Sequence, residues 1–214
     1  MARIENTSRE RILERVRTAL KAPTPYHPAT LAGPIFSEVT DPVARFQAEC
    51  TANLMECILA RDEADSAAEI TKVLQSLPAG DIFIQDAPQF RRMAAGWTDR
   101  NIQWSSAGRP AEQTYASITA CEAFVAMSGS ILISSGCGGR AGSVSTECHI
   151  VHGTLNQLLP DLEAAMAHIY KAGLFEKHSY VGLITGSSRT ADIEKILVMG
   201  AHGPRRLVVI VQTG

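Results

Sequence analysis

Apolar residues recur along the chain at spacings of three and four in several stretches, the pattern of helices with one buried face. The clearest stretch predicts an amphipathic helix over residues 8–21, with apolar positions at Ile12, Leu13, Val16 and Leu20. The same pattern predicts further helices over residues 41–53, 65–77, 89–95, 158–174 and 189–199.

Short apolar runs bounded by turn residues predict strands. These runs cover residues 56–60, 81–85, 102–104, 123–126, 130–134, 148–152, 180–185 and 207–211. The tight turn at 127–129 joins two of them into an antiparallel hairpin, with Gly129 at a positive φ. Most other strands alternate with helices. The predicted fold class is therefore α/β, a three-layer and mainly parallel sheet with an antiparallel hairpin.

Prolines divide the chain into two parts. Four of them fall within a dozen residues, which excludes continued helix there, at Pro23, Pro25, Pro28 and Pro34. We therefore expect an amino-terminal helix and proline-rich strap over residues 1–40, and one main domain over residues 41–214.

Composition and charge exclude several classes of protein. The 214 residues include 20 basic and 22 acidic side chains, a formal net charge of -2, so no positive field favours nucleic acid. No apolar run reaches bilayer length, and the amino end lacks the apolar core of a secretory signal. We expect no membrane span and a cytoplasmic protein.

Five cysteines without a CxxC pair predict neither a disulfide framework nor a metal or iron–sulfur site. Gly136 to Ala141 formally matches a GxGxxA dinucleotide fingerprint, but we expect a strand after it, so phosphates would meet no helix end. No cofactor is predicted. Arg140 in this glycine loop is a candidate to bind an anion. The alternative is that the loop is a surface connection without a ligand.

The stretch after residue 185 carries the main candidate binding site. Ser187 or Ser188 is the expected N-cap of the helix over 189–199, at the carboxyl edge of the parallel sheet. Free backbone N–H groups, hydroxyls and a guanidinium there suit a carboxylate or phosphate. The alternative is an ordinary helix cap. The proposed anion-binding residues are Gly186, Ser187, Ser188, Arg189, Thr190 and Asp192.

Two histidine positions remain as secondary candidates. His149 and His152 point to opposite faces of a strand, so they cannot chelate one ion, and no metal is predicted. His149 either faces a cleft beside the glycine loop or is a core residue whose ring nitrogens form hydrogen bonds within the protein. His202 lies in a turn, where it is structural, part of a second site, or part of a subunit contact.

Taken together, these segments resemble the LutC/YkgG family of lactate utilization proteins, whose LUD domain is similar in fold to the NagB/RpiA/CoA-transferase superfamily. The most distinctive match is Ser188-Arg-Thr-Ala-Asp-Ile-Glu194 with His202-Gly-Pro204. The hairpin at Gly129 and Ser130, the loop around Arg140 and the strand at His149 match other signature segments. One departure concerns Met127, which occupies the position of the family's usual glutamate and cannot act as a nucleophile. Catalytic residues therefore stay unassigned.

The resemblance implies a cluster-free component of a system that oxidises L-lactate to pyruvate, a non-catalytic subunit rather than an enzyme. Its implied partners are the iron–sulfur subunits of that system and a small anionic ligand, with self-association left open. Two alternatives remain, an independent enzyme resembling CoA transferases or sugar-phosphate isomerases, and a ligand-free scaffold.

Overall fold

The computed structural model describes residues 4–21, 36–108, 114–191, 197–199 and 203–214. The chain divides into two compact units, Met1–Ile35 and Phe36–Gly214. In the first unit, α1 (Ile4–Lys21) confirms the predicted amino-terminal helix. Its apolar side chains at Ile12, Val16 and Leu20 are exposed.

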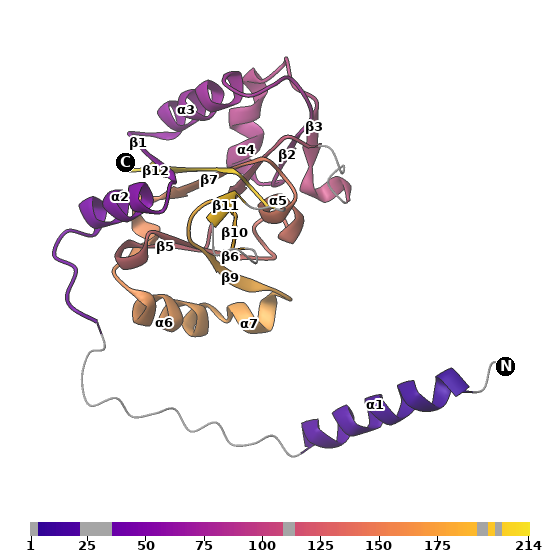
Figure 1. Ribbon diagram of the computed structural model, residues 1–214. Helices are drawn as coiled ribbons and strands as arrows, with labels where there is room; N and C mark the ends of the chain where they lie inside the picture. Colours follow the sequence, from indigo (N-terminus) through magenta and orange to yellow (C-terminus); the bar gives the residue numbers. More distant parts are fainter. Residues whose placement is uncertain (1–3, 22–35, 109–113, 192–196, 200–202) are drawn as a thin grey trace. The chain divides into compact units, whose positions relative to one another are not determined.

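Six parallel strands form the main sheet of the second unit, in the order β1-β12-β7-β4-β2-β3 (Figure 1). They are β1 (Glu56–Ala60), β2 (Ile82–Ile84), β3 (Ile102–Trp104), β4 (Ala116–Ala120), β7 (Cys148–Thr154) and β12 (Arg206–Gln212). Five of these strands were expected from the sequence, and the sixth, β4, was not. Its Ala-Ser-Ile-Thr-Ala sequence has one large apolar residue, yet four of its five residues are buried.

Helices α3 (Glu63–Gln75) and α4 (Pro88–Met93) cover one face of this sheet (Figure 1). Asp62 caps α3 by accepting a hydrogen bond from the Asp65 amide at 2.8 Å. The chain continues from α4 through the short turns η1 (Ala94–Gly96) and, after β3, η2 (Ser105–Ala107). The core between helices and sheet is built around Ile70, Phe90 and Ile150, all fully buried. The α/β class with a mainly parallel sheet is confirmed.

The other face carries α2 (Pro42–Ala52) and a second sheet, ordered β8-β5-β6-β9. Its strands are β5 (Ala123–Val125), β6 (Ser130–Ser134), β8 (Leu158–Leu159) and β9 (Val181–Ile184). The predicted hairpin is β5–β6, joined through η3 (Ala126–Ser128) and Gly129, whose φ is 61°. Phe46 of α2 and Phe124 of β5 pack in the core between the two sheets, with ring centroids 5.3 Å apart.

A further layer covers the outer face of the second sheet. It consists of α6 (Leu162–Ala172) and α7 (Leu174–Lys177), which pack on β5 and β6 through Ile169 and Leu174. The helix predicted over 158–174 begins four residues late because Pro160 precedes the cap Asp161, whose carboxylate accepts from the Ala164 amide at 2.8 Å. The remaining elements are α5 (Arg140–Val144) and η4 (Leu155–Gln157).

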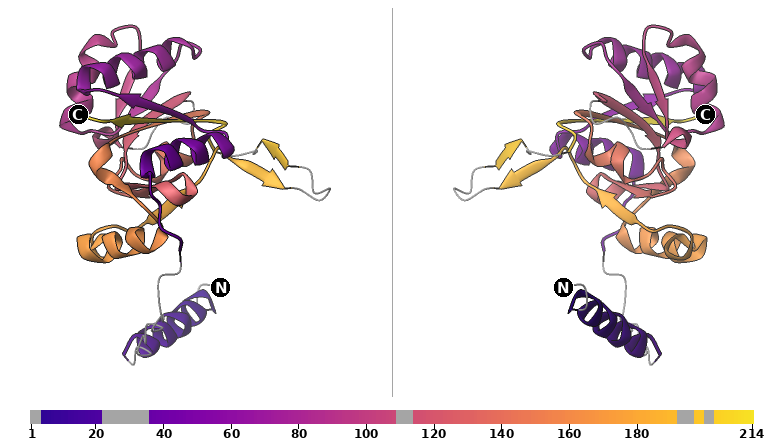
Figure 2. Two further views of the ribbon diagram at one scale, coloured as in Figure 1. Left: turned by 90° about the vertical axis from the view of Figure 1, so that its left-hand side faces the viewer. Right: turned by 90° about the vertical axis from the view of Figure 1, so that its right-hand side faces the viewer.

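The prediction of a helix over residues 189–199 is wrong. The described part of this stretch is a hairpin of β10 (Arg189–Ala191) and β11 (Leu197–Met199), which extends away from the body of the molecule (Figure 2). Two sequence signals favour this outcome. Thr190 and Val198 are β-branched, and the expected cap lacks an acidic residue three positions on, so the helix had no capping box.

The predicted position of the preceding loop is wrong as well. β9 pairs antiparallel with β6 in the second sheet and is not a strand of the parallel sheet. The loop at 186–188 therefore does not lie at the carboxyl edge of the parallel sheet. It lies beside the amino end of β12, where the Ser188 amide donates to the Pro204 carbonyl at 2.8 Å.

Replacing Gly129 tests the packing of the hairpin on α2. A Cβ at this position would lie 2.9 Å from the Glu49 carbonyl carbon and 3.0 Å from the Cys50 nitrogen, both backbone atoms. Left-handed backbone alone costs a non-glycine residue about 1 to 2 kcal/mol. We therefore expect Gly129→Ala to lower the free energy of unfolding by at least about 2 kcal/mol in urea denaturation. Gly80→Ala is the control, because no atom lies within 4 Å of its Cβ. Equal stability of the two variants would contradict this account.

Candidate functional site

A cleft lies at the carboxyl edge of the parallel sheet, where the strand order reverses. The chain leaves β2 toward β3 on one side and leaves β4 toward β7 on the other, so neighbouring strands β2 and β4 form a topological switch point. Ligands of open α/β sheets bind at such points. The cleft here has a volume of about 550 Å³ and is lined by Gln85, Asp86, Ser105, Gly108 and residues 135, 136 and 138–141.

Gln85 holds the glycine-rich side of this cleft in place. Its side chain accepts a hydrogen bond from the Ala120 amide at 2.7 Å and donates to the Gly136 carbonyl at 3.1 Å. Gly138 has a φ of +81°, and a Cβ there would lie 3.2 Å from the Gln85 Cβ. The loop therefore approaches β2 closely because it has no side chain at this point.

The expectation that a strand follows this loop directly is wrong. The backbone turns at Gly139 and enters α5 at Arg140, and β7 begins only at Cys148. The formal match to a dinucleotide fingerprint thus does precede a helix. That helix is five residues long, much shorter than the helix of a dinucleotide-binding βαβ unit.

Of the charged side chains around the cleft, Asp86 has a counter-charge beside it and Arg140 has none among the described residues. Asp86 accepts two hydrogen bonds from Arg91, at 2.8 and 2.9 Å, and one from the Ser106 hydroxyl. These contacts lower the pKa of Asp86 to about 2, and the Arg91 guanidinium also stacks 3.7 Å from the centre of the Trp104 ring. Arg140 forms no ion pair with any described residue. Its guanidinium therefore supplies an uncompensated positive charge at the cleft.

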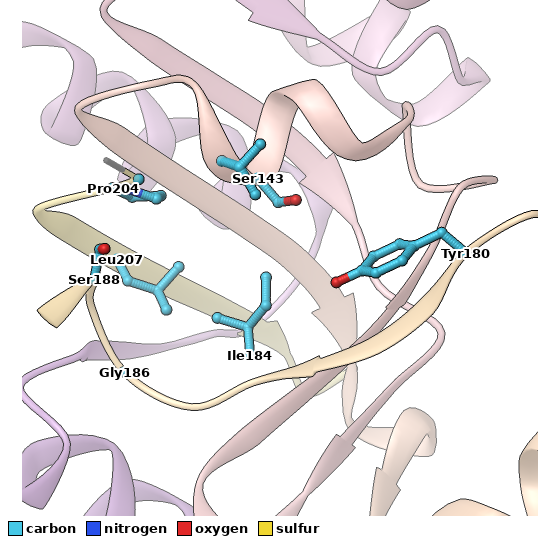
Figure 3. Close-up of a pocket in the computed structure, with 9 residues that line it drawn as sticks. Ser143, Tyr180, Ile184, Gly186, Ser188, Pro204 and Leu207 are labelled. Atoms are coloured by element: carbon cyan, nitrogen blue, oxygen red, sulfur yellow. The ribbon is translucent and has the colours of Figure 1, made fainter. Parts of the chain in front are cut away.

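The residues predicted to bind an anion do not lie at this cleft. Those that the structure describes lie at a second site, an apolar cavity of about 320 Å³ (Figure 3). Gly186 and Ser188 line this cavity, and Ser187 is buried. Two of the backbone amides expected to meet an anion have partners within the fold, because the Gly186 amide donates to the Met55 sulfur at 3.2 Å and the Ser188 amide donates to the Pro204 carbonyl. The side chains of Arg189 and Thr190, and the whole of Asp192 and His202, lie outside the described residues.

Two secondary candidates have contacts within the fold. Gly129 packs on α2, and the Ser130 hydroxyl bonds to the hydroxyls of Ser128 and Thr185 at 2.8 and 2.6 Å. Asn53 also donates to the Ser128 carbonyl at 3.1 Å. These contacts tie the turn of the β5–β6 hairpin to α2 and to the end of β9.

The two histidines of β7 lie on opposite faces, as predicted. The His152 ring packs edge-on against Phe90, whereas the Nε2 of His149 bonds to the Thr119 hydroxyl at 2.8 Å. His149 is fully buried, its Nδ1 has no hydrogen-bond partner among the residues that the structure describes, and burial lowers its pKa to about 4. Within the described part of the chain, no group of three or more metal-ligating side chains is close enough to hold an ion.

Sequence reasoning missed Gln85, Asp86 and Ser105 as functional candidates. The signal that could have found them is their position, since Gln85 and Ser105 directly follow the apolar strands β2 and β3, and Asp86 comes one residue later. Tyr180 was also missed, because it was read as the first residue of a strand. Its ring lies 5.0 Å from the Arg140 guanidinium, and it lines the apolar cavity.

The buried His149 predicts a pH dependence of stability. Its pKa is about 4 in the folded state against 6.5 for the free side chain, so between these pH values the unfolded state binds more protons. Stability is therefore complete above about pH 6.5 and falls as the pH decreases toward 4, by up to about 3 kcal/mol from this group. We expect His149→Gln, which keeps a partner for Thr119, to reduce this loss in urea denaturation at pH 7 and pH 4.5.

His168→Gln is the matched control, because His168 is partly exposed on α6. It should retain the full acid-induced loss of stability. An identical loss in His149→Gln and the unmodified protein would show that the imidazole of His149 does not titrate as its burial requires.

Comparisons with known proteins agree with the fold. A family model described as the LUD domain matches residues 43–211. A "Lactate utilization protein C" from a Geobacillus strain is 31% identical over 189 residues, which is 78% of this chain and 76% of that protein. The protein of the same name from Geobacillus thermodenitrificans is 28% identical over 70% of each chain.

One solved structure is also similar, the crystal structure of a DUF162 family protein from Deinococcus radiodurans. It superimposes with a TM-score of 0.63 at 19% sequence identity and covers 81% of this chain and 96% of that one. At this identity the likeness concerns the fold.

Proposed function

The chain belongs to the LUD domain family, and from this premise we propose that it takes part in lactate utilization by binding a small anion in the cleft beside Arg140. The names of its relatives support the pathway. The observation that carries the binding proposal is the Arg140 guanidinium at the switch point of the parallel sheet, which forms no ion pair with any described residue.

The chemistry of the cleft suits a carboxylate or a phosphate. A guanidinium makes short, charge-assisted hydrogen bonds to such oxygens. Asp86 does not oppose binding strongly, because Arg91 neutralises it. The hydroxyl of Ser105 accepts from the Asp86 amide at 2.8 Å and holds that side of the cleft in place.

The proposal extends to iron–sulfur partner subunits. Oxidation of lactate to pyruvate releases two electrons, and this chain has no cluster motif to accept them. Four of its five cysteines are buried and none forms a disulfide: Cys50, Cys121, Cys137 and Cys148. In this proposal the chain supplies anion binding and assembly, and other chains carry the electrons.

Replacing Arg140 tests the anion site. Arg140→Gln removes a charge-assisted contact worth about 1.5 to 3 kcal/mol, so affinity for L-lactate, pyruvate or inorganic phosphate should fall at least about tenfold in calorimetric titration. Arg140→Lys should retain part of the affinity because the charge stays. The fold should survive, since the Arg140 side chain is exposed and makes no ion pair with a described residue.

Arg205→Gln is the matched control, because Arg205 is an exposed arginine that pairs with Glu147 near the amino end of β12. It should bind the anions as the unmodified protein does. Undiminished binding by Arg140→Gln would contradict the proposed site. Unchanged growth on L-lactate after deletion of the gene, with its partners intact, would contradict the pathway.

A further inference from the structure

The apolar cavity is separate from the cleft at Arg140, and the two lie at opposite ends of α5. The first residues of α5, Arg140 and Ala141, line the cleft, whereas Ser143 and Val144 line the cavity. The cavity is closed on its other sides by β9, the base of the β10–β11 hairpin and the start of β12 (Figure 3). Its volume of about 320 Å³ is in the range of small-molecule sites.

The walls of the cavity exclude a charged ligand. They are formed mainly by the apolar side chains of Val144, Ile184, Pro204 and Leu207, and none of the described residues that line the space is charged. A carboxylate or phosphate entering it would lose part of its hydration against apolar side chains, which is unfavourable. The site therefore differs in chemistry from the cleft, where Arg140 supplies a positive charge.

The cavity does offer a hydrogen bond. The hydroxyl of Tyr180 points into it (Figure 3) and has no hydrogen-bond partner among the described residues. The Tyr180 side chain also packs closely on the backbone of Gly182. A Cβ atom added at Gly182 would lie only 2.4 Å from the phenol oxygen, so the position of this ring depends on the glycine. A fixed hydroxyl without a protein partner is a group that a ligand can satisfy.

A buried polar side chain lies next to Leu207, a residue of the cavity lining. His149 and Leu207 are partners in the register of β7 and β12, so their side chains are neighbours on one face of the sheet. His149 is fully buried, and within the described part of the chain its Nδ1 has no hydrogen-bond partner. A core position that served packing alone would be filled more favourably by an apolar side chain, since an unsatisfied buried nitrogen costs about 1 to 3 kcal/mol.

We infer that this cavity binds an uncharged molecule with an apolar body and one hydroxyl or carbonyl group, which bonds to the hydroxyl of Tyr180. The inference does not depend on the proposed role in lactate utilization. It depends on the cavity, its apolar walls and the Tyr180 hydroxyl, which has no hydrogen-bond partner among the described residues.

Three matched probes test it with the full-length protein. Benzyl alcohol has an apolar ring and a hydroxyl, toluene lacks the hydroxyl, and benzoate carries a charge. In amide NMR titrations we expect benzyl alcohol to produce saturable shifts at Ile184 and Leu207, with about fivefold higher affinity than toluene. Benzoate should leave these amides unchanged. Saturable benzoate shifts at both amides, or no saturable shift with either uncharged probe, would overturn the inference.

Two variants localise the binding. Tyr180→Phe should weaken benzyl alcohol about fivefold and leave toluene unaffected, because only the hydroxyl is lost. Val144→Phe should weaken both probes by filling the rim, where Val144 is 51% exposed. Met166→Phe is the control, since Met166 is 42% exposed on α6, away from the cavity lining.

The control should bind both probes normally. If Tyr180→Phe binds benzyl alcohol as tightly as the unmodified protein, the phenol is not the ligand's partner and the inference is wrong. If Val144→Phe and Met166→Phe bind equally well, the probes occupy another site, and the inference is wrong for that reason.

Discussion

A parallel sheet of six strands has two apolar faces, and the need to bury both of them organises this molecule. The central strands β7 and β12 are buried along almost their whole length. Helices α3 and α4 cover one face. The other face is covered by α2 and by a second sheet, which in turn needs α6 and α7 on its outer side.

This layering determines where open space remains. Helices and the second sheet cover the faces, so the edges of the parallel sheet are the places where side chains can meet a ligand. The cleft with Arg140 occupies the carboxyl edge, and the apolar cavity begins near the amino end of β12. α5 connects the two, so one short helix contributes to a charged site and to an uncharged one.

Much of the fold could be predicted from the sequence. Long amphipathic helices and β-branched runs such as Leu207–Val211 have a single physical interpretation, and the Gly129 turn identified the hairpin. Strand β4 was not predicted, because its small and hydroxyl residues do not form the apolar run that is typical of a buried strand. The segment 189–199 was misjudged because its apolar residues fit both periods, and only pairing between two strands decided in favour of the hairpin. The cleft could not be predicted from the sequence for a different reason. Gln85, Ser105 and Arg140 are far apart in sequence, and only the strand order brings them together.

The central claim is that the guanidinium of Arg140 receives an anion at the switch point of the parallel sheet. A crystal structure of the protein grown with L-lactate or pyruvate tests it most directly. We expect a carboxylate within hydrogen-bond distance of that guanidinium, against the loop at Gly136–Gly139. A carboxylate bound elsewhere, or Arg140 paired with an acidic side chain of the protein in its place, would contradict it.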